Sequence, residues 1–178
     1  LASNDTNFII PVYQRNYDWT NVQCKQLLKD ILSVGSRPEE SSHFIGSIVF
    51  VHDDVYSSTG ITELVVIDGQ QRLTTITLIY IALYRVAVLQ GDERLANKIQ
   101  KTYLINEFSD EPEKLKLKPT DNNRMALAHT IDPVANMPVE TFSRLIDNYT
   151  YFETQISKNN SETVLNGLSK LMFVEISL

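Results

Sequence analysis

Apolar and polar positions near the start of the chain follow first the period of a strand and then that of a helix. Residues 8–12 are apolar and β-rich, and the proline among them suits the edge or end of a strand. Residues 22–32 carry apolar side chains at helical spacing. We expect Thr20 or Asn21 to cap this helix and Gly35 to follow its last turn.

Two β-branched runs come next, residues 43–51 and 63–67, and the polar segment between them predicts a hairpin loop. Gly46 lies inside the first run, where a glycine often marks a bulge or a close approach by a ligand or backbone. The chain then passes through Asp68 to Arg72 into an apolar stretch, residues 73–89. That stretch is at the short limit for crossing a bilayer and is interrupted by threonines and an arginine. We therefore expect a buried central helix and not a membrane-spanning one.

Beyond residue 90 the pattern is mainly helical. Asp92 can cap a helix that runs to about residue 105, and a short strand and a proline break precede a helix capped by Thr120 or Asp121. Residues 138–157 carry apolar side chains along one helical face.

These elements predict an α+β protein with a small mixed sheet. We expect a core over residues 1–90 and a mainly helical extension over residues 91–178 that ends in a strand. The terminal apolar run, "LMFVEISL", either pairs within the sheet or marks the place where a longer protein was cut, and we favour the second interpretation.

Composition narrows the class of protein. With 178 residues, 43% of them hydrophobic and 21% charged, the chain resembles an ordinary folded domain. A net charge of −6 argues against a whole-surface grip on nucleic acid. The single cysteine, Cys24, excludes a disulfide framework and a Cys-based zinc site. No secretory signal pattern opens the chain, and we expect a cytoplasmic protein.

The polar stretch "DGQQR", Asp68 to Arg72, joins a strand to the first turn of the central helix. One interpretation is structural, because Asp68 and Gln71 have the spacing of a capping box. The other is an anion site at the positive end of the helix. Gly69 would let a phosphate approach the backbone and Arg72 would bind it in bidentate fashion.

Neighbouring residues extend the second interpretation. Thr74 and Thr75 could add hydroxyl donors, and Asp68 could orient a metal ion or a ribose hydroxyl. The familiar Gly-rich phosphate loops are absent from the sequence. Physical chemistry alone therefore leaves the capped helix and the anion site equally open.

A second polar stretch, "IPVYQRNYDW", alternates aromatic surface with directional donors. Tyr13, Tyr17 and Trp19 could stack on a planar base, and Gln14 and Arg15 could bind a phosphate. Alternatively the aromatics cover the core at an edge strand, and for an isolated segment this structural interpretation is favoured.

Together, "IPVYQRNYDW", "HFIGSIVF" and "VIDGQQRLTTI" closely resemble the N-terminal domain of GmrSD-type modification-dependent restriction proteins. That family is related to the ParB and sulfiredoxin fold, so the resemblance implies a ParB/sulfiredoxin-like nucleotide-binding core over residues 1–90. The resemblance is strongest over residues 8 to about 90, and it returns at "LKLKPTDNNR" and "FVEISL".

The resemblance implies a nucleotide-binding, NTP-hydrolysing domain that helps to sense modified foreign DNA in an anti-phage restriction system and controls a nuclease. Asp68 and Arg72 would be catalytic, with Asp68 also holding Mg²⁺. The expected nucleotide-binding residues are Gln14, Arg15, Gly69, Gln70, Gln71, Thr74 and Thr75. Residues expected to recognise or support the ligand are Tyr13, Tyr17, Trp19 and Gly46.

Two pieces found in related proteins are not in this sequence. One is an Asn-x-x-Gly-like segment after the strand that resembles "FVEISL", and the other is a His-rich nuclease domain of HNH type. We therefore expect the nuclease to be a separate domain or subunit. We expect modified DNA to be contacted indirectly, or through the full-length protein.

Two other functions stay open. The same pocket could recognise a modified nucleotide without turnover, or the chain could be a ParB-like nuclease. The three histidines, His43, His52 and His129, show no metal-ligand spacing, which weighs against the nuclease.

Overall fold

A computed structural model describes residues 6–39, 42–52, 60–109, 114–133 and 143–177. Five strands form one mixed sheet in the order β4-β1-β3-β2-β5. The strands are β1 (Thr6–Ile9), β2 (His43–His52), β3 (Thr62–Asp68), β4 (Leu117–Lys118) and β5 (Leu171–Ser177). β1 runs parallel to β3 and β4, whereas β2 is antiparallel to β3 and parallel to β5. The predicted α+β class with a small mixed sheet is confirmed.

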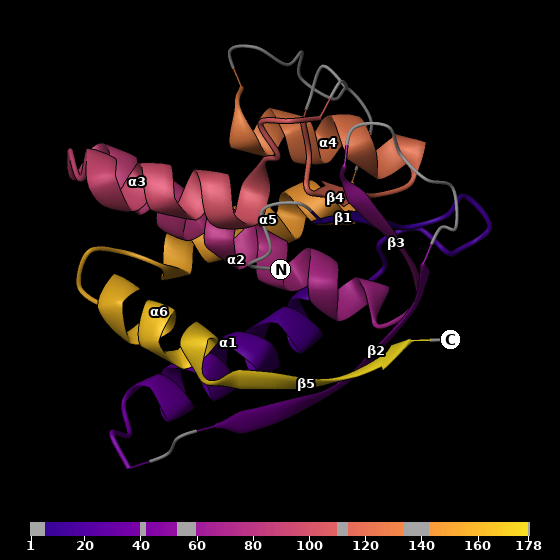
Figure 1. The fold of residues 1–178 in the computed structure, drawn as a ribbon. Helices are drawn as coiled ribbons and strands as arrows, with labels where there is room; N and C mark the ends of the chain where they lie inside the picture. The colour runs from indigo at the N-terminus through magenta and orange to yellow at the C-terminus, as the bar shows by residue number, and fades with distance from the viewer. Residues whose placement is uncertain (1–5, 40–41, 53–59, 110–113, 134–142, 178) are drawn as a thin grey trace.

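The helices pack around this sheet (Figure 1). They are α1 (Asn21–Gly35), α2 (Gln70–Leu89), α3 (Glu93–Ile99), the π-helix η1 (Gln100–Leu104), α4 (Asp121–Ile131), α5 (Arg144–Gln155) and α6 (Ser161–Ser169). β4 and β5 come from beyond residue 90, so both parts of the predicted division contribute strands to one sheet.

The central helix α2 is covered on nearly all sides. Its buried residues run almost without interruption from Gln70 to Leu83, which is the pattern of a helix inside a core rather than on a surface. The helix is long and apolar enough to cross a membrane by composition, but most of it is buried inside the protein. Within it, Thr75 and Thr77 donate their hydroxyls to the carbonyls of Gln71 and Leu73 one turn earlier. The expected buried central helix is therefore confirmed.

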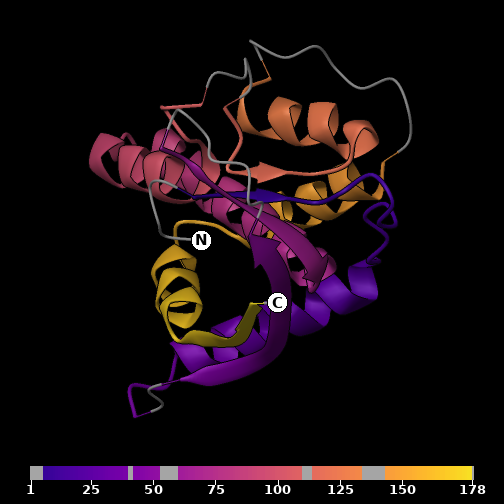
Figure 2. The ribbon, with the colours of Figure 1, turned by 45° about the vertical axis from the view of Figure 1, so that its right-hand side comes forward.

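The long strand β2 connects two parts of the curved sheet (Figure 2). Its residues 49–52 pair with β3, while residues 43–50 pair with β5. β5 is the terminal apolar run of the sequence, and it pairs with β2 within the sheet, which was the less favoured of the two interpretations.

Helix α1 begins as predicted and ends differently. Thr20 is its N-cap, and a capping box with Gln23 closes its first turn. Gly35, however, is the last helical residue and not the residue after the turn, because Ser36 caps the helix end. A side chain at Gly35 would collide with the carbonyl oxygen of Thr163 in α6. The glycine is there because the two helices approach closely.

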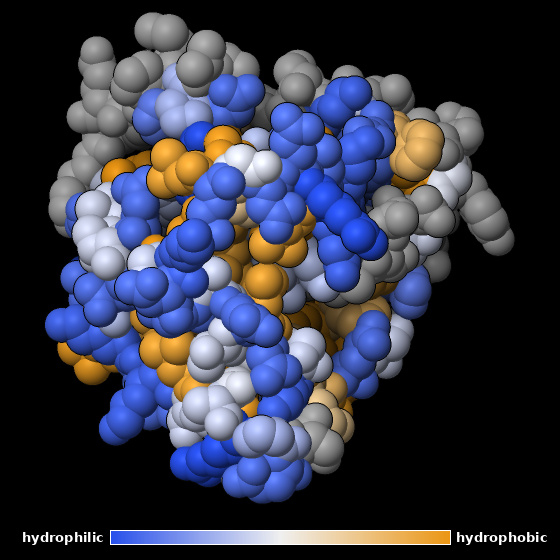
Figure 3. Space-filling model, turned by 90° about the vertical axis from the view of Figure 1, so that its left-hand side faces the viewer, coloured by the Kyte–Doolittle hydropathy of each residue, from blue (hydrophilic) through white to orange (hydrophobic). Residues whose placement is uncertain are grey.

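Helix α6 was not predicted from the sequence. It contains Gly167, where a side chain would collide with the backbone of Ile31 in α1. A glycine lowers helix propensity, so the residue that allows α6 to pack also weakens its sequence signal. The face that carries α3 and α6 is mostly hydrophilic, with apolar side chains showing in patches (Figure 3).

The first strand is displaced from its predicted place: β1 is Thr6–Ile9, so residues 10–12 of the predicted run at 8–12 lie outside it, where Pro11 has no N–H to donate. Two later predictions agree. Asp92 caps α3 by accepting the Leu95 N–H, and the helical stretch continues through η1 to Leu104. The predicted helix at 138–157 is seen from Arg144, and its earlier residues, like most of the predicted loop at 52–62, lie outside the described residues.

Candidate functional site

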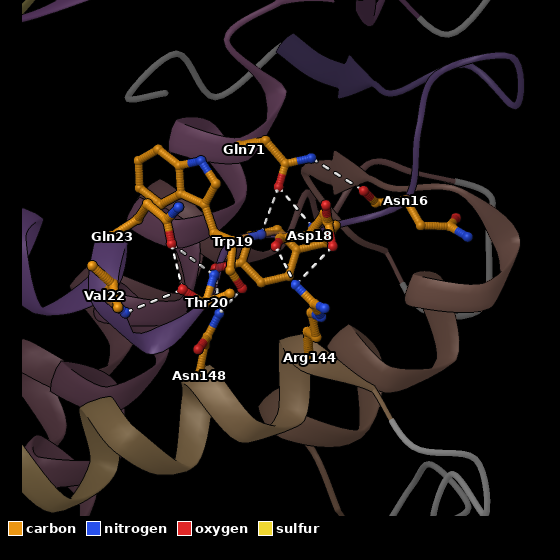
Figure 4. Close-up of polar contacts among 10 residues, drawn as sticks. Asn16, Asp18, Trp19, Thr20, Val22, Gln23, Gln71, Arg144 and Asn148 are labelled. Atoms are coloured by element: carbon orange, nitrogen blue, oxygen red, sulfur yellow. Dashed lines mark hydrogen bonds and ion pairs between the residues drawn. The ribbon is translucent and has the colours of Figure 1, made fainter.

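Gln71, at the start of α2, holds residues 16–19 through their backbone (Figure 4). Oε1 of Gln71 accepts the backbone N–H groups of Asp18 and Trp19 at 2.8 and 3.2 Å, and its Nε2 donates to the carbonyl of Asn16 at 3.1 Å. One buried amide therefore binds three backbone groups within residues 16–19. Both polar atoms of the Gln71 side chain are thus bonded to this loop.

Two further amides join the same segments. Nε2 of Gln70 donates to the carbonyl of Arg15 at 3.3 Å, and Nε2 of Gln14 donates to the carbonyl of Ile67 at 3.0 Å. The two polar stretches singled out in the sequence therefore form one unit, although more than fifty residues separate them.

Helix α5 clamps the loop from the other side. The guanidinium of Arg144 bonds the carboxylate of Asp18 at 2.8 Å and its carbonyl at 2.9 Å. Nδ2 of Asn148 donates to the carbonyl of Trp19 at 2.7 Å. Sequence reasoning missed both residues. Asn148 had a usable signal, because it is a polar residue on the apolar face of an amphipathic helix.

Tyr17 anchors the loop in the core. Because the Thr75 hydroxyl donates to the Gln71 carbonyl, the Tyr17 hydroxyl donates to Thr75 Oγ1 at 2.8 Å. Tyr17 also accepts a hydrogen bond from Asn148 at 3.0 Å. Burial raises the pKa of Tyr17 well above its ordinary value, so the phenol stays protonated. Tyr17 supports the loop from inside the protein.

The predicted capping box at Asp68 is wrong. Gly69 is the N-cap of α2 with a φ of 89°, and no side chain caps this helix. Asp68 instead ends β3 opposite Val49, and the Gln71 amide is used on the loop. The left-handed glycine makes the sharp turn from strand to helix, which leaves the amides of the first turn without a capping side chain.

A cleft of about 190 Å³ opens at this helix start. Its lining residues are Gln14, Arg15, Trp19, Ile67, Asp68, Gly69, Gln70, Gln71 and Arg72. Two guanidinium groups and one carboxylate therefore share the cleft with the positive end of a helix. Gln14 and Arg15, expected to bind the same nucleotide as the 68–72 stretch, do line the same cleft as that stretch.

One buried polar atom at the cleft lacks a partner. Gln70 is 7% exposed, and its Oε1 makes no hydrogen bond among the described residues. A buried amide oxygen without a partner is costly to folding. An amide oxygen accepts hydrogen bonds, so only a donor group could satisfy this atom, and a phosphate oxygen could not.

Arg72 explains the glycine of β2. Its Nη1 donates to the carbonyl of Ser47 at 2.8 Å, and a side chain at Gly46 would collide with the guanidinium. Gly46 has a φ of +114° and lies where the register of β2 and β5 shifts. The predicted bulge is confirmed, and the group that approaches the glycine is the side chain of Arg72.

Some predicted site residues do not reach the cleft. Tyr13 is 72% exposed and is not among the residues that line it. Thr74 and Thr75 are buried and also absent from the lining. The part of the chain that the structure describes holds no group of three His, Cys, Asp or Glu side chains that could bind a metal ion.

Comparison with known proteins agrees with the resemblance of the sequence motifs. The family described as "GmrSD restriction endonuclease, N-terminal domain" matches residues 1–178. The match therefore covers the helical part and β5 as well as the two polar stretches. A search of curated proteins finds no match.

Proposed function

This chain belongs to the family of GmrSD restriction endonuclease N-terminal domains and has a role in a restriction system, and we propose that its cleft binds the triphosphate of a nucleotide. The observation that carries the proposal is the lining of the cleft. Arg15 and Arg72 line the cleft at the uncapped start of α2. Helix N-termini with nearby arginines are suited to phosphate groups.

The two arginines have different roles in this proposal. Arg15 is exposed, and its guanidinium is available for a phosphate. Arg72 is held against Ser47 by a hydrogen bond, so its charge is preorganised beside the helix start. Fixed charges of this kind stabilise a transferred phosphoryl group because they do not reorganise during the reaction. On this basis we propose that Arg72 stabilises the charge on the transferred phosphoryl group during hydrolysis.

Asp68 is the carboxylate of the cleft, exposed at the end of β3. Magnesium is commonly held by one or two carboxylates together with substrate phosphates, so Asp68 fits an ion that arrives with the triphosphate. Such an ion would neutralise phosphate charge. Asp68 would hold the ion or orient a water molecule toward the terminal phosphate.

In the restriction system, we propose that nucleotide binding by this domain regulates a nuclease of HNH type on another domain or subunit. Modified DNA would be sensed through the full-length protein in the cytoplasm. The acidic net charge of −6 supports this division, because a strongly acidic domain has little non-specific affinity for DNA.

A second candidate function is recognition of a modified nucleotide without turnover. The observation that favours it is that Asp68 is the sole carboxylate among the described residues lining the cleft, which leaves one side chain to serve as metal ligand or base. Release of inorganic phosphate separates the two functions.

The experiment is calorimetric titration of the chain with each common ribonucleoside triphosphate, with and without Mg²⁺, followed by an assay of phosphate release. We expect Arg72→Ala to weaken triphosphate binding by about tenfold or more, because a preorganised charged hydrogen bond is lost. Arg94→Ala, an exposed arginine on α3, is the matched control. Equal affinity in wild type and Arg72→Ala at matched salt would overturn the proposal.

A further inference from the structure

A second cavity adjoins the cleft. It has a volume of about 420 Å³ and lies between the first half of α1 and the start of β2. Its lining residues are Trp19, Gln23, Gln26, Leu27, Asp30, His43, Phe44, Ile45, Gly46 and Arg72. Trp19 and Arg72 line both spaces, so the two are neighbours at these side chains.

The cleft alone is small for a nucleotide. Pockets that hold small ligands usually measure about 300–1,000 Å³. The cleft, at about 190 Å³, has room for the phosphates, while the adjoining cavity at about 420 Å³ has room for a base and its sugar. We infer that the second cavity is the base subsite of the nucleotide, which would stack on Trp19 and Phe44 while its phosphates reach past Arg72 into the cleft.

The side chains of the second cavity differ in chemistry from those of the cleft. Phe44 is 60% exposed, which is unusual for a large aromatic residue on a strand. Trp19 is half-buried, and its backbone is fixed by Gln71 and Asn148. Aromatic faces held in this way provide stacking surface for any base.

Polar groups that could contact the edge of a base lie on α1. Nε2 of Gln26 donates to Oδ1 of Asp30 at 2.8 Å, which holds that carboxylate at the cavity. Gln23 is occupied, because its Oε1 accepts from Thr20 in the capping box of α1. Asp30 and Gln26 are therefore the groups that would meet the N–H donors of a base.

The bulge at Gly46 links the two spaces. It makes room for the Arg72 guanidinium, and it shifts the register of β2 between Phe44 and Ser47. Bulges typically re-aim the side chains of a strand. The bulge thus positions Arg72 for the phosphates in the cleft and Phe44 for the base in the second cavity.

The inference rests on the proposed function, and the test separates the two. Trp19 is the chain's single tryptophan and lines both spaces, so its emission reports on both, and comparing a ligand that has a base with one that lacks it separates the two. The chain is titrated with a nucleoside triphosphate and with inorganic tripolyphosphate, which has the phosphates without the base. We expect the nucleotide to bind at least about tenfold more tightly and to change Trp19 emission, because stacking adds to phosphate binding.

Phe44→Ala is the decisive variant, and Phe108→Ala, which alters an exposed phenylalanine that does not line the cavity, is its control. Phe44→Ala should reduce nucleotide affinity toward that of tripolyphosphate and leave tripolyphosphate affinity unchanged. Equal affinities for the two ligands, together with no effect of Phe44→Ala, would overturn the base subsite while the phosphate site stands. Absence of binding by both ligands would overturn the proposed function and this inference with it.

Discussion

The rim of the cleft and the loop beneath it contain neighbouring residues of the same two motifs, yet their side chains are used in opposite ways. Gln71 and Tyr17 are buried, and their polar atoms bond to other parts of the protein. Arg15 and Asp68 are exposed, and among the described residues their side chains make no hydrogen bond. Residues adjacent in sequence are thus divided between holding the site and facing its contents.

This contrast separates two kinds of experimental effect. Removing a buried, fully bonded group should cost folding free energy first and binding as a consequence. Removing an exposed charge should cost binding with little effect on folding. The predictions below are ordered by their expected effect on the free energy of unfolding.

The largest loss is expected for Gln71→Ala. It leaves the N–H groups of Asp18 and Trp19 without their acceptor, so we expect the free energy of unfolding to fall by about 2–4 kcal/mol. Urea denaturation measures this change. Gln155→Ala, which alters an exposed glutamine at the end of α5, should stay within about 0.5 kcal/mol of wild type. Similar stabilities for both variants would contradict the holding role of Gln71.

Gly46→Ala should have the next largest effect. Alanine at a φ of +114° is strained, and its Cβ would collide with the guanidinium of Arg72. We expect a loss of about 1–3 kcal/mol together with weaker triphosphate binding, because Arg72 must move.

Gly91→Ala is the matched control for this substitution. Gly91 also has a positive φ, +70°, but nothing lies within 4 Å of its added Cβ. It should show the backbone strain without the loss of binding. A Gly46→Ala protein with unchanged triphosphate affinity would show that the position of Arg72 does not matter.

A smaller effect is expected at high pH from the core beside the loop. Burial raises the pKa of Cys24 from 9.0 to about 11. As pH rises through this window, the unfolded chain loses the thiol proton before the folded chain does, so the free energy of unfolding should fall. Cys24→Ser should show a shallower fall when urea denaturation is repeated across the window. Parallel curves for the two proteins would contradict the raised pKa.

The smallest effect on folding is expected for Arg15→Ala. The side chain is exposed, so the free energy of unfolding should change by less than about 0.5 kcal/mol. Triphosphate affinity should nevertheless fall by about tenfold, because a charged partner of the phosphates is removed. Calorimetric titration and urea denaturation of the same preparation test both statements. A variant that loses stability and keeps its affinity would reverse the roles assigned to rim and loop.

Local patterns were sufficient for most of the fold. The β-branched runs became β2 and β3, the continuous apolar stretch became the buried helix α2, and Thr20 capped α1 as its residue type favours. These elements depend on neighbours within a few residues, which is why the sequence alone indicates them. The same holds for the strand-to-helix junction at Gly69.

Local patterns failed where two distant segments meet. The spacing of Asp68 and Gln71 fits a capping box, but Gln71 bonds the backbone of the distant loop instead. Gly35 resembles a helix stop, but it is a contact point with α6. In each case a residue with a sound local interpretation had a more favourable long-range partner.

The sequence by itself thus determined the elements and the two polar stretches that carry the candidate chemistry. Only the tertiary structure decided which of their side chains hold the loop, as Gln71 does, and which face the cleft, as Arg15 and Arg72 do. The physical reason is that helix and strand signals are set by short-range periodicity, whereas a buried amide must be satisfied by whichever backbone groups the fold brings to it.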